Sequence, residues 1–244
     1  MSRVPLGTII LLIVSLLIYF GVAQRVLDKL RLSDKAALGI IAALIIGSFI
    51  DIPLPRGARI EASLNVGGAV IPLVLSGYLI STTTNKEKLR AGAGIIVTGA
   101  AVYLAGRFLP AEPESMLIGP LYLYPLVGGV VAYLIGRSRR ASFIAATMGI
   151  LLFDLFSYLR MMTLGIPGTA NIGGGGAFDV IVIAGLLAVL LAEFIGETRE
   201  RLQGGPAESG KAPALLKSLR PLSPEKREKT QQEEVGEQDE AEEN

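Results

Sequence analysis

Seven apolar runs constrain the fold of this chain more than any other feature of its sequence. Each run is about 17–21 residues long, which is the length at which an α-helix crosses the hydrocarbon core of a bilayer. Lipid offers no hydrogen-bond partners, so a crossing segment must satisfy its own backbone groups, as a helix does. The sequence therefore predicts an all-α polytopic protein of the cell membrane, with spans at 4–23, 36–54, 65–82, 91–108, 116–135, 141–160 and 177–196.

The basic residues of the short loops predict how these spans are oriented, because cytoplasmic loops are enriched in Lys and Arg. One set of loops carries Arg25, Lys29, Arg31, Lys35, Lys86, Lys88, Arg90, Arg137, Arg139 and Arg140. The opposite set carries only Arg3, Arg56, Arg59, Arg107 and Arg160. We therefore expect the N-terminus outside and the C-terminus in the cytoplasm. The first run lacks a small-residue cleavage site, so we expect it to stay as an anchor rather than leave as a signal peptide.

The composition changes abruptly after the last apolar run. Residues 1–196 are predicted to form the transmembrane helical domain, whereas residues 197–244 are rich in Glu, Lys, Gln and Pro. A segment of that composition cannot bury enough apolar surface to fold alone. We therefore expect residues 197–244 to be a disordered, charged cytoplasmic tail.

The chain contains neither Cys nor His, and this absence narrows the chemistry open to it. Disulfides, thiolate or imidazole metal sites, and Ser-His or Cys-His nucleophile pairs are excluded. We expect no metal and no cofactor, and no basic motif points to nucleic acid. The expected partners are the lipid bilayer and either a membrane-protein or a small-solute substrate, while the oligomeric state stays open.

Two segments of the sequence resemble each other. Each begins with an asparagine, Asn65 or Asn171, and runs through a Gly-Gly-Ala sequence into a span. Each also follows a span with an aspartate near its outer end, Asp51 or Asp154. The pattern predicts two parallel three-helix units joined by the fourth span, a layout known among transporters. Chance similarity between glycine-rich apolar helices is the alternative explanation.

Four ionisable groups fall within the predicted spans: Asp51, Asp154, Asp179 and Glu193. Such groups are costly in a membrane and therefore indicate function. The three aspartates are expected at similar depth in the outer half of the bilayer. Asp154 and Asp179 belong to consecutive helices, and if they face each other one keeps its proton while the other ionises. A pair of this kind can activate water against a peptide carbonyl, so we predict Asp154 and Asp179 as catalytic residues.

Structural roles for these groups remain open. Asp179 lies near a helix N-terminus, where a carboxylate caps unsatisfied N–H groups. Asp51 can end its helix at the interface and meet Arg56. Glu193 can pair with Arg199 near the cytoplasmic end of the last span.

The glycine run at 173–176 also has two interpretations. It is either a flexible hinge or a surface without Cβ atoms that an extended peptide can approach closely. On the second interpretation Gly175 and Gly176 contact substrate. The remaining candidates for substrate binding are Asn171, Asn65 and Asp51.

Three stretches resemble a known family of prokaryotic membrane proteins. They are Gly-Ser-Phe-Ile-Asp-Ile-Pro-Leu at 47–54, Leu-Asn-Val-Gly-Gly-Ala-Val-Ile-Pro-Leu at 64–73 and Gly-Gly-Ala-Phe-Asp at 175–179. They are similar to sequences of domain of unknown function 1614. The resemblance implies a membrane location and carries no established activity.

A second, local resemblance bears on chemistry. Residues 149–156 are similar to the Tyr-Asp helix of signal peptide peptidases and presenilins, and residues 176–185 are similar to their Gly-x-Gly-Asp helix. The resemblance implies that Asp154 and Asp179 are the catalytic pair of an intramembrane protease. The chain departs from that family at Phe153, where Tyr is usual, and at Phe178, where Gly is usual. The family also has nine helices, and the only Pro-Ala-Leu sequence here, at 213–215, lies in the tail.

The sequence is therefore compatible with three functions. The first is a presenilin-like intramembrane aspartyl protease. The second is a proton- or cation-coupled transporter of small solutes built from paired three-helix bundles, a layout similar to that of SWEET-type sugar transporters. The third is a membrane scaffold without catalysis.

Overall fold

Seven helices account for most of the chain in a computed structural model, which describes residues 6–30, 32–55, 60–108 and 120–202. Met1–Glu197 forms one compact unit and Thr198–Asn244 another, and all contacts given below lie within the first. The tail expected at 197–244 lies outside the described residues from 203 onwards. The helices are α1 (Leu6–Lys29), α2 (Asp34–Gly47), α3 (Ile71–Thr82), α4 (Asn85–Phe108), α5 (Pro120–Gly136), α6 (Arg139–Leu164) and α7 (Val180–Leu202).

Each predicted span overlaps with one of these helices, so the helical fold class is confirmed. Three helical segments among the described residues are long and apolar enough to cross a membrane: Asn85–Phe108, Arg139–Leu164 and Val180–Thr198. Val66–Thr82 and Tyr122–Gly136 are apolar but shorter.

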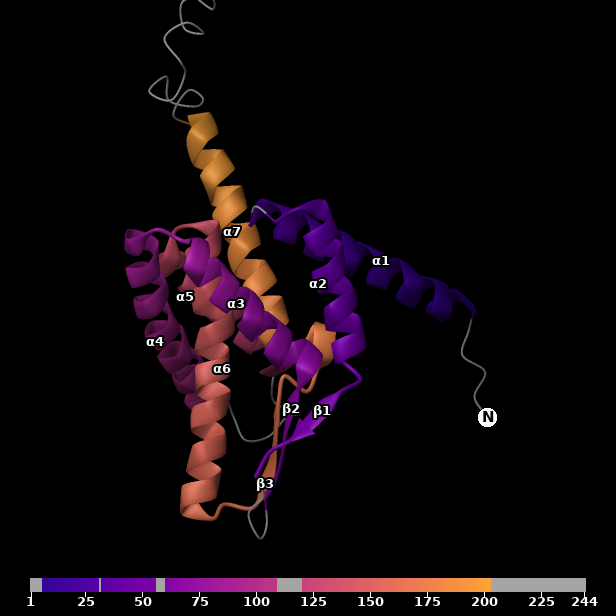
Figure 1. Ribbon diagram of the computed structural model, residues 1–244, viewed down its shortest axis with the longest axis vertical. Helices are drawn as coiled ribbons and strands as arrows, with labels where there is room; N and C mark the ends of the chain where they lie inside the picture. The colour runs from indigo at the N-terminus through magenta and orange to yellow at the C-terminus, as the bar shows by residue number, and fades with distance from the viewer. Residues whose placement is uncertain (1–5, 31, 56–59, 109–119, 203–244) are drawn as a thin grey trace, which may run out of the picture. The chain divides into compact units, whose positions relative to one another are not determined.

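A small sheet is the element that the sequence analysis missed. It has three strands in the order β1 (Asp51–Pro53), β2 (Ile60–Asn65) and β3 (Gly168–Ile172). Strand β2 pairs with β1 in antiparallel and with β3 in parallel orientation. Figure 1 shows the strands at one end of the helices, beside the last turns of α6.

The prediction of one helix over 36–54 was therefore wrong in its last part, because α2 ends at Gly47 and Asp51 belongs to β1. Pro53 accounts for part of the difference, since a proline disfavours helical backbone in the residue before it, here Ile52. Proline also lacks a backbone N–H, which a strand tolerates at the edge of a sheet, where β1 lies.

The apolar core is arranged around α6 and α7. One group of buried side chains packs α1, α2 and α3 against them, with Leu30, Leu79 and Ile144 fully buried. A second group packs α5 and the sheet against the same two helices. The crossing of α4 and α6 is so close that a Cβ on Gly99 would lie 2.9 Å from the carbonyl oxygen of Gly149. Small residues at such crossings let helices pack tightly without a hydrophobic driving force.

Candidate functional site

The two similar segments of the sequence lie side by side. In the parallel pairing of β2 and β3, Ser63 is opposite Asn171, and the Ser63 hydroxyl donates to Asn171 Oδ1 at 3.0 Å. Each strand leads through a glycine-rich turn into a helix: η1 (Val66–Val70) before α3, and η3 (Gly176–Phe178) before α7. The aspartates that precede the two segments do not match, since Asp51 is on a strand and Asp154 is inside a helix.

Asn65 joins the end of α2 to β1 and to the turn η1. Its side chain is buried, and its amide nitrogen donates to Ser48 O and to Asp51 Oδ1, both at 2.9 Å. Its amide oxygen accepts from Gly68 N at 2.9 Å, which caps η1. The structure therefore shows Asn65 and Asp51 holding the fold, whereas sequence analysis placed both among the substrate-binding candidates. The meeting of Asp51 with Arg56 lies outside the described residues.

The glycine run 173–176 divides into a packed part and an exposed part. Gly173 and Gly176 are buried with positive φ angles of 71° and 60°, and a Cβ on Gly68 would lie 2.1 Å from the carbonyl oxygen of Gly173. Gly174 and Gly175 are exposed. Of the two predicted substrate contacts, Gly175 is therefore accessible and Gly176 is packed against Ser48.

Asp179 caps α7. Its Oδ1 accepts from Ile181 N at 2.9 Å and its Oδ2 accepts from Gly175 N at 3.0 Å. The capping role considered from the sequence is therefore present. A carboxylate oxygen can accept more than one hydrogen bond, so these two bonds leave acceptor capacity on the half-buried side chain.

Asp154 lies inside α6 and is half-buried. Among the described residues its carboxyl group has no hydrogen-bond partner. The two aspartates predicted as a pair lie within range of an electrostatic interaction with each other. A half-buried carboxyl without local partners beside a second carboxyl is the arrangement that a cap or a surface ion pair does not explain.

Two tyrosines from other helices complete the surroundings, and sequence analysis did not identify either of them. Tyr124 of α5 interacts electrostatically with Asp154, and its ring packs on Phe153 with centroids 6.0 Å apart. A phenol therefore lies near Asp154 even though position 153 is Phe. Tyr19 of α1 donates its hydroxyl to Ala177 O and packs on Phe178 at 4.5 Å.

Ser48 is a third residue that the sequence did not single out. It accepts from Ala177 N at 2.8 Å and donates to Leu44 O at 2.6 Å, which fixes the start of α7 to the end of α2. Its position just before Phe49 and near Asp51 gives no signal by itself, because its partner is 129 residues away. No group of three metal-ligating side chains occurs in the described part of the chain.

Glu193 is far from the aspartates and is paired. Its carboxylate forms ion pairs with Lys29 of α1, at 2.6 Å, and with Arg139 of α6. The structural role expected for Glu193 is therefore found, with Lys29 and Arg139 as its partners. The expected pairing with Arg199 concerns a side chain that lies outside the described part of the structure.

The comparisons with known proteins give a family and no activity. A family model described as a protein of unknown function (DUF1614) matches residues 43–191, which is more than half of the chain. The match includes all of the site described above except Tyr19. No curated protein and no solved structure matches.

Proposed function

Because the chain belongs to this family of unknown function, we propose a function from the site itself: an intramembrane aspartyl protease with Asp154 and Asp179 as its catalytic pair. One observation carries the proposal. Two half-buried carboxyl groups on consecutive helices interact electrostatically, and one of them has no hydrogen-bond partner among the described residues.

The division of roles follows from the hydrogen bonds. The N–H groups of Gly175 and Ile181 favour the charged form of Asp179, while the described part of the chain offers no such donor to Asp154. The proton shared by the pair therefore resides on Asp154. Asp179 takes a proton from water as the water oxygen attacks the peptide carbonyl carbon, and Asp154 protonates the carbonyl oxygen. The resulting diol then collapses: Asp154 takes back a proton from one of its hydroxyl groups, Asp179 gives its proton to the amine nitrogen, and the C–N bond breaks to leave an acid and an amine.

Gly174 and Gly175 supply a surface for substrate beside this pair. Both are exposed and lack a Cβ atom, so the backbone of an extended peptide can come close to them. An extended segment is the form that a protease needs, because a helix keeps its carbonyl groups hydrogen-bonded. The proposed substrate is therefore a membrane-protein segment that unwinds locally at the glycine run.

The proposal includes a cell-membrane location with seven crossings, the N-terminus outside and the C-terminus in the cytoplasm. The pocket shared by Lys29, Glu87 and Arg139 supports the alternation, since it collects the end of α1 and the starts of α4 and α6. At the opposite end, the sheet pairs the strand that follows α2 with the strands that precede α3 and α7. The loop charges then assign the basic end to the cytoplasm.

A transporter is the second candidate, because the two similar segments lie in parallel as a repeat would place them. The transporter proposal is weakened because Asp51 lies on a strand and Asp154 inside a helix, so the two aspartates do not occupy equivalent positions. In a transporter with matched units, Asp51→Asn and Asp154→Asn would impair uptake equally, whereas a protease depends on Asp154 and Asp179.

A peptide isostere tests the protease directly. A hydroxyl group in place of the scissile carbonyl mimics the tetrahedral intermediate and contacts both carboxyl groups. A photoreactive isostere should label the purified chain, and Asp154→Asn should weaken its binding at least about tenfold, which corresponds to the loss of about one hydrogen bond. Glu61→Gln, which removes an exposed carboxylate of β2, is the matched control. Equal labelling of wild type and Asp154→Asn would contradict the proposal.

A further inference from the structure

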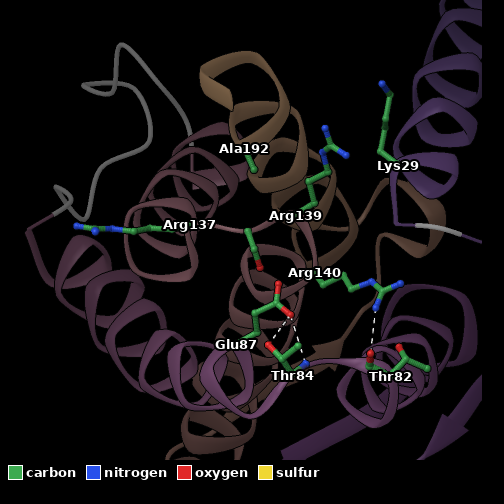
Figure 2. Close-up of a pocket in the computed structure, with 9 residues that line it drawn as sticks. Lys29, Thr82, Thr84, Glu87, Arg137, Arg139, Arg140 and Ala192 are labelled. Atoms are coloured by element: carbon green, nitrogen blue, oxygen red, sulfur yellow. Dashed lines mark hydrogen bonds between the residues drawn. The ribbon is translucent and has the colours of Figure 1, made fainter. Parts of the chain in front are cut away.

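The pocket at the end of the helices where α6 begins has a lining rich in cations (Figure 2). It has a volume of about 500 Å³, which is within the range of small-molecule sites. Four cationic residues line it: Lys29, Arg137, Arg139 and Arg140. Among them, Figure 2 shows Lys29, Arg139 and Arg140 on one side and Arg137 extending the opposite way.

Arg140 is held in place by neutral groups. Its Nη1 donates to Thr82 O at 3.0 Å and its Nε donates to Leu30 O at 3.4 Å. These carbonyl oxygens orient the guanidinium group without neutralising its charge. Three further N–H groups of the fork remain for a ligand.

Lys29 and Arg139 are paired with the same carboxylate and are still accessible. Both contact Glu193, so one negative charge faces two positive ones. Their side chains keep 41% and 44% of their surface exposed. The positive charge of Lys29 and Arg139 together therefore exceeds the negative charge of Glu193, and the excess attracts an anion that enters the pocket.

Glu87 is the only other carboxylate that the described residues bring to the pocket. Its Oε2 accepts from the hydroxyl of Thr84 at 3.0 Å and from Thr84 N at 3.3 Å. Ser138 also bonds to it, and Arg140 interacts with its charge. The four lining cations thus outnumber Glu87 and Glu193, and the pocket keeps a positive field.

The start of α6 adds to this field. Ser138 caps the helix by accepting from Ala141 N at 3.2 Å, and the pocket is lined by Ser138, Arg139 and Arg140 at the helix N-terminus. The partial positive charge there reinforces the side-chain cations.

We propose that this pocket binds a phosphate group, supplied by an anionic phospholipid headgroup or by a soluble phosphate compound. Guanidinium forks match phosphate oxygens in pairs, which gives Arg139 and Arg140 the recognition role. The ends of apolar helices lie at the level of lipid headgroups, and basic pockets between such helices bind anionic lipids. The inference is independent of the aspartate chemistry.

Thermal unfolding of the full chain in nonionic detergent tests the proposal and separates the two sources. The probes are short-chain phosphatidylglycerol, diacylglycerol with the same chains, and inorganic phosphate. A rise in Tm with phosphatidylglycerol but not with diacylglycerol supports a headgroup site. A rise with inorganic phosphate alone supports a soluble ligand. No rise with either phosphate probe, or an equal rise with diacylglycerol, would overturn the proposal.

Variants then locate the binding. Arg139→Gln should weaken phosphate-dependent binding about tenfold, as expected for one charge-assisted contact. Arg139→Lys keeps the positive charge and the ion pair with Glu193, so it should lose less affinity for phosphate than Arg139→Gln. Lys88→Gln removes an exposed charge of α4 outside the pocket and should bind like wild type. If Arg139→Gln does not fold, Lys29→Gln serves as the pocket variant, because Glu193 then still has its ion pair with Arg139. Equal losses in the pocket variant and in Lys88→Gln would contradict the assignment.

Discussion

At the scale of single residues, Asp179 has two separable roles. Its carboxylate oxygens accept hydrogen bonds from the N–H groups of Gly175 and Ile181, and these bonds stabilise the start of α7. Its charge faces Asp154, which is the basis of the proposed chemistry. Asn keeps one of the two accepting oxygens and removes the charge, whereas Ala removes both oxygens and the charge.

The capping role predicts a graded loss of stability. Asp179→Ala should lower the free energy of unfolding by about 1 kcal/mol, the usual cost of removing a cap. Asp179→Asn should cost less, because Asn keeps one acceptor oxygen for the N–H group of Ile181 and loses only the bond from Gly175. Denaturant unfolding in mixed micelles measures both. Equal losses for the two variants would show that charge, rather than capping, holds this turn.

The contact between the two glycine-rich turns predicts a larger effect. Gly68→Ala should destabilise the fold by about 1–3 kcal/mol, since its Cβ would meet the Gly173 carbonyl oxygen and force the turns apart. Gly77→Ala in α3 is the control, because nothing lies within 4 Å of the added atom. We expect Gly77→Ala to be neutral or slightly stabilising, as Ala is the better helix former. Thermal unfolding in detergent compares the pair, and a tolerated Gly68→Ala would refute the packing described here.

Residues differ in how far the sequence predicts them. Asp154 and Asp179 could be paired in advance, because charged residues in apolar runs stand out and consecutive helices are neighbours. The role of Asn65 could not be predicted. Its hydrogen bonds to Ser48 and Gly68 are tertiary contacts, which leave no periodic pattern in the sequence. Tyr124 was missed for the same reason, since it reaches Asp154 from a different helix.

At the scale of elements, the helices were predictable and the sheet was not. Long apolar runs predicted all seven helices, although α1, α2, α3, α4 and α7 each begin or end six or seven residues from the predicted bound. Strands β2 and β3 are short, and their partners are more than 100 residues apart, so no local alternation marks them. The similarity of the segments at Asn65 and Asn171 was the only sequence signal that linked them.

The register of β2 and β3 can be tested because the chain contains no cysteine of its own. A chain carrying Ser63→Cys and Asn171→Cys should form a disulfide on mild oxidation, since directly paired strand residues lie within bridging distance. Ser63→Cys with Thr169→Cys shifts the pair by two positions and should react far more slowly. Gel mobility with and without reductant reports the bond. Faster bridging of the shifted pair would place the strands in another register.

At the scale of the whole molecule, the proposed path through the membrane makes a prediction about the ends of the helices. A reporter fused after Gly196 should be cytoplasmic, and one inserted between Pro55 and Ile60 should be extracytoplasmic, because the basic loops favour the cytoplasm. Paired alkaline phosphatase and fluorescent protein fusions measure both sides. An exposed C-terminus on intact cells would reverse the orientation.

The central claim is that Asp154 and Asp179 act as a catalytic pair, and proteolysis by the purified chain tests it most directly. Wild type should cleave a helical membrane substrate in detergent or liposomes. Asp154→Asn and Asp179→Asn should each lower the rate by at least about a hundredfold, because Asn cannot exchange the proton, while both variants keep their fold. Glu61→Gln should cleave like wild type. Undiminished cleavage by Asp154→Asn, or no cleavage of any membrane substrate by wild type, would contradict the account.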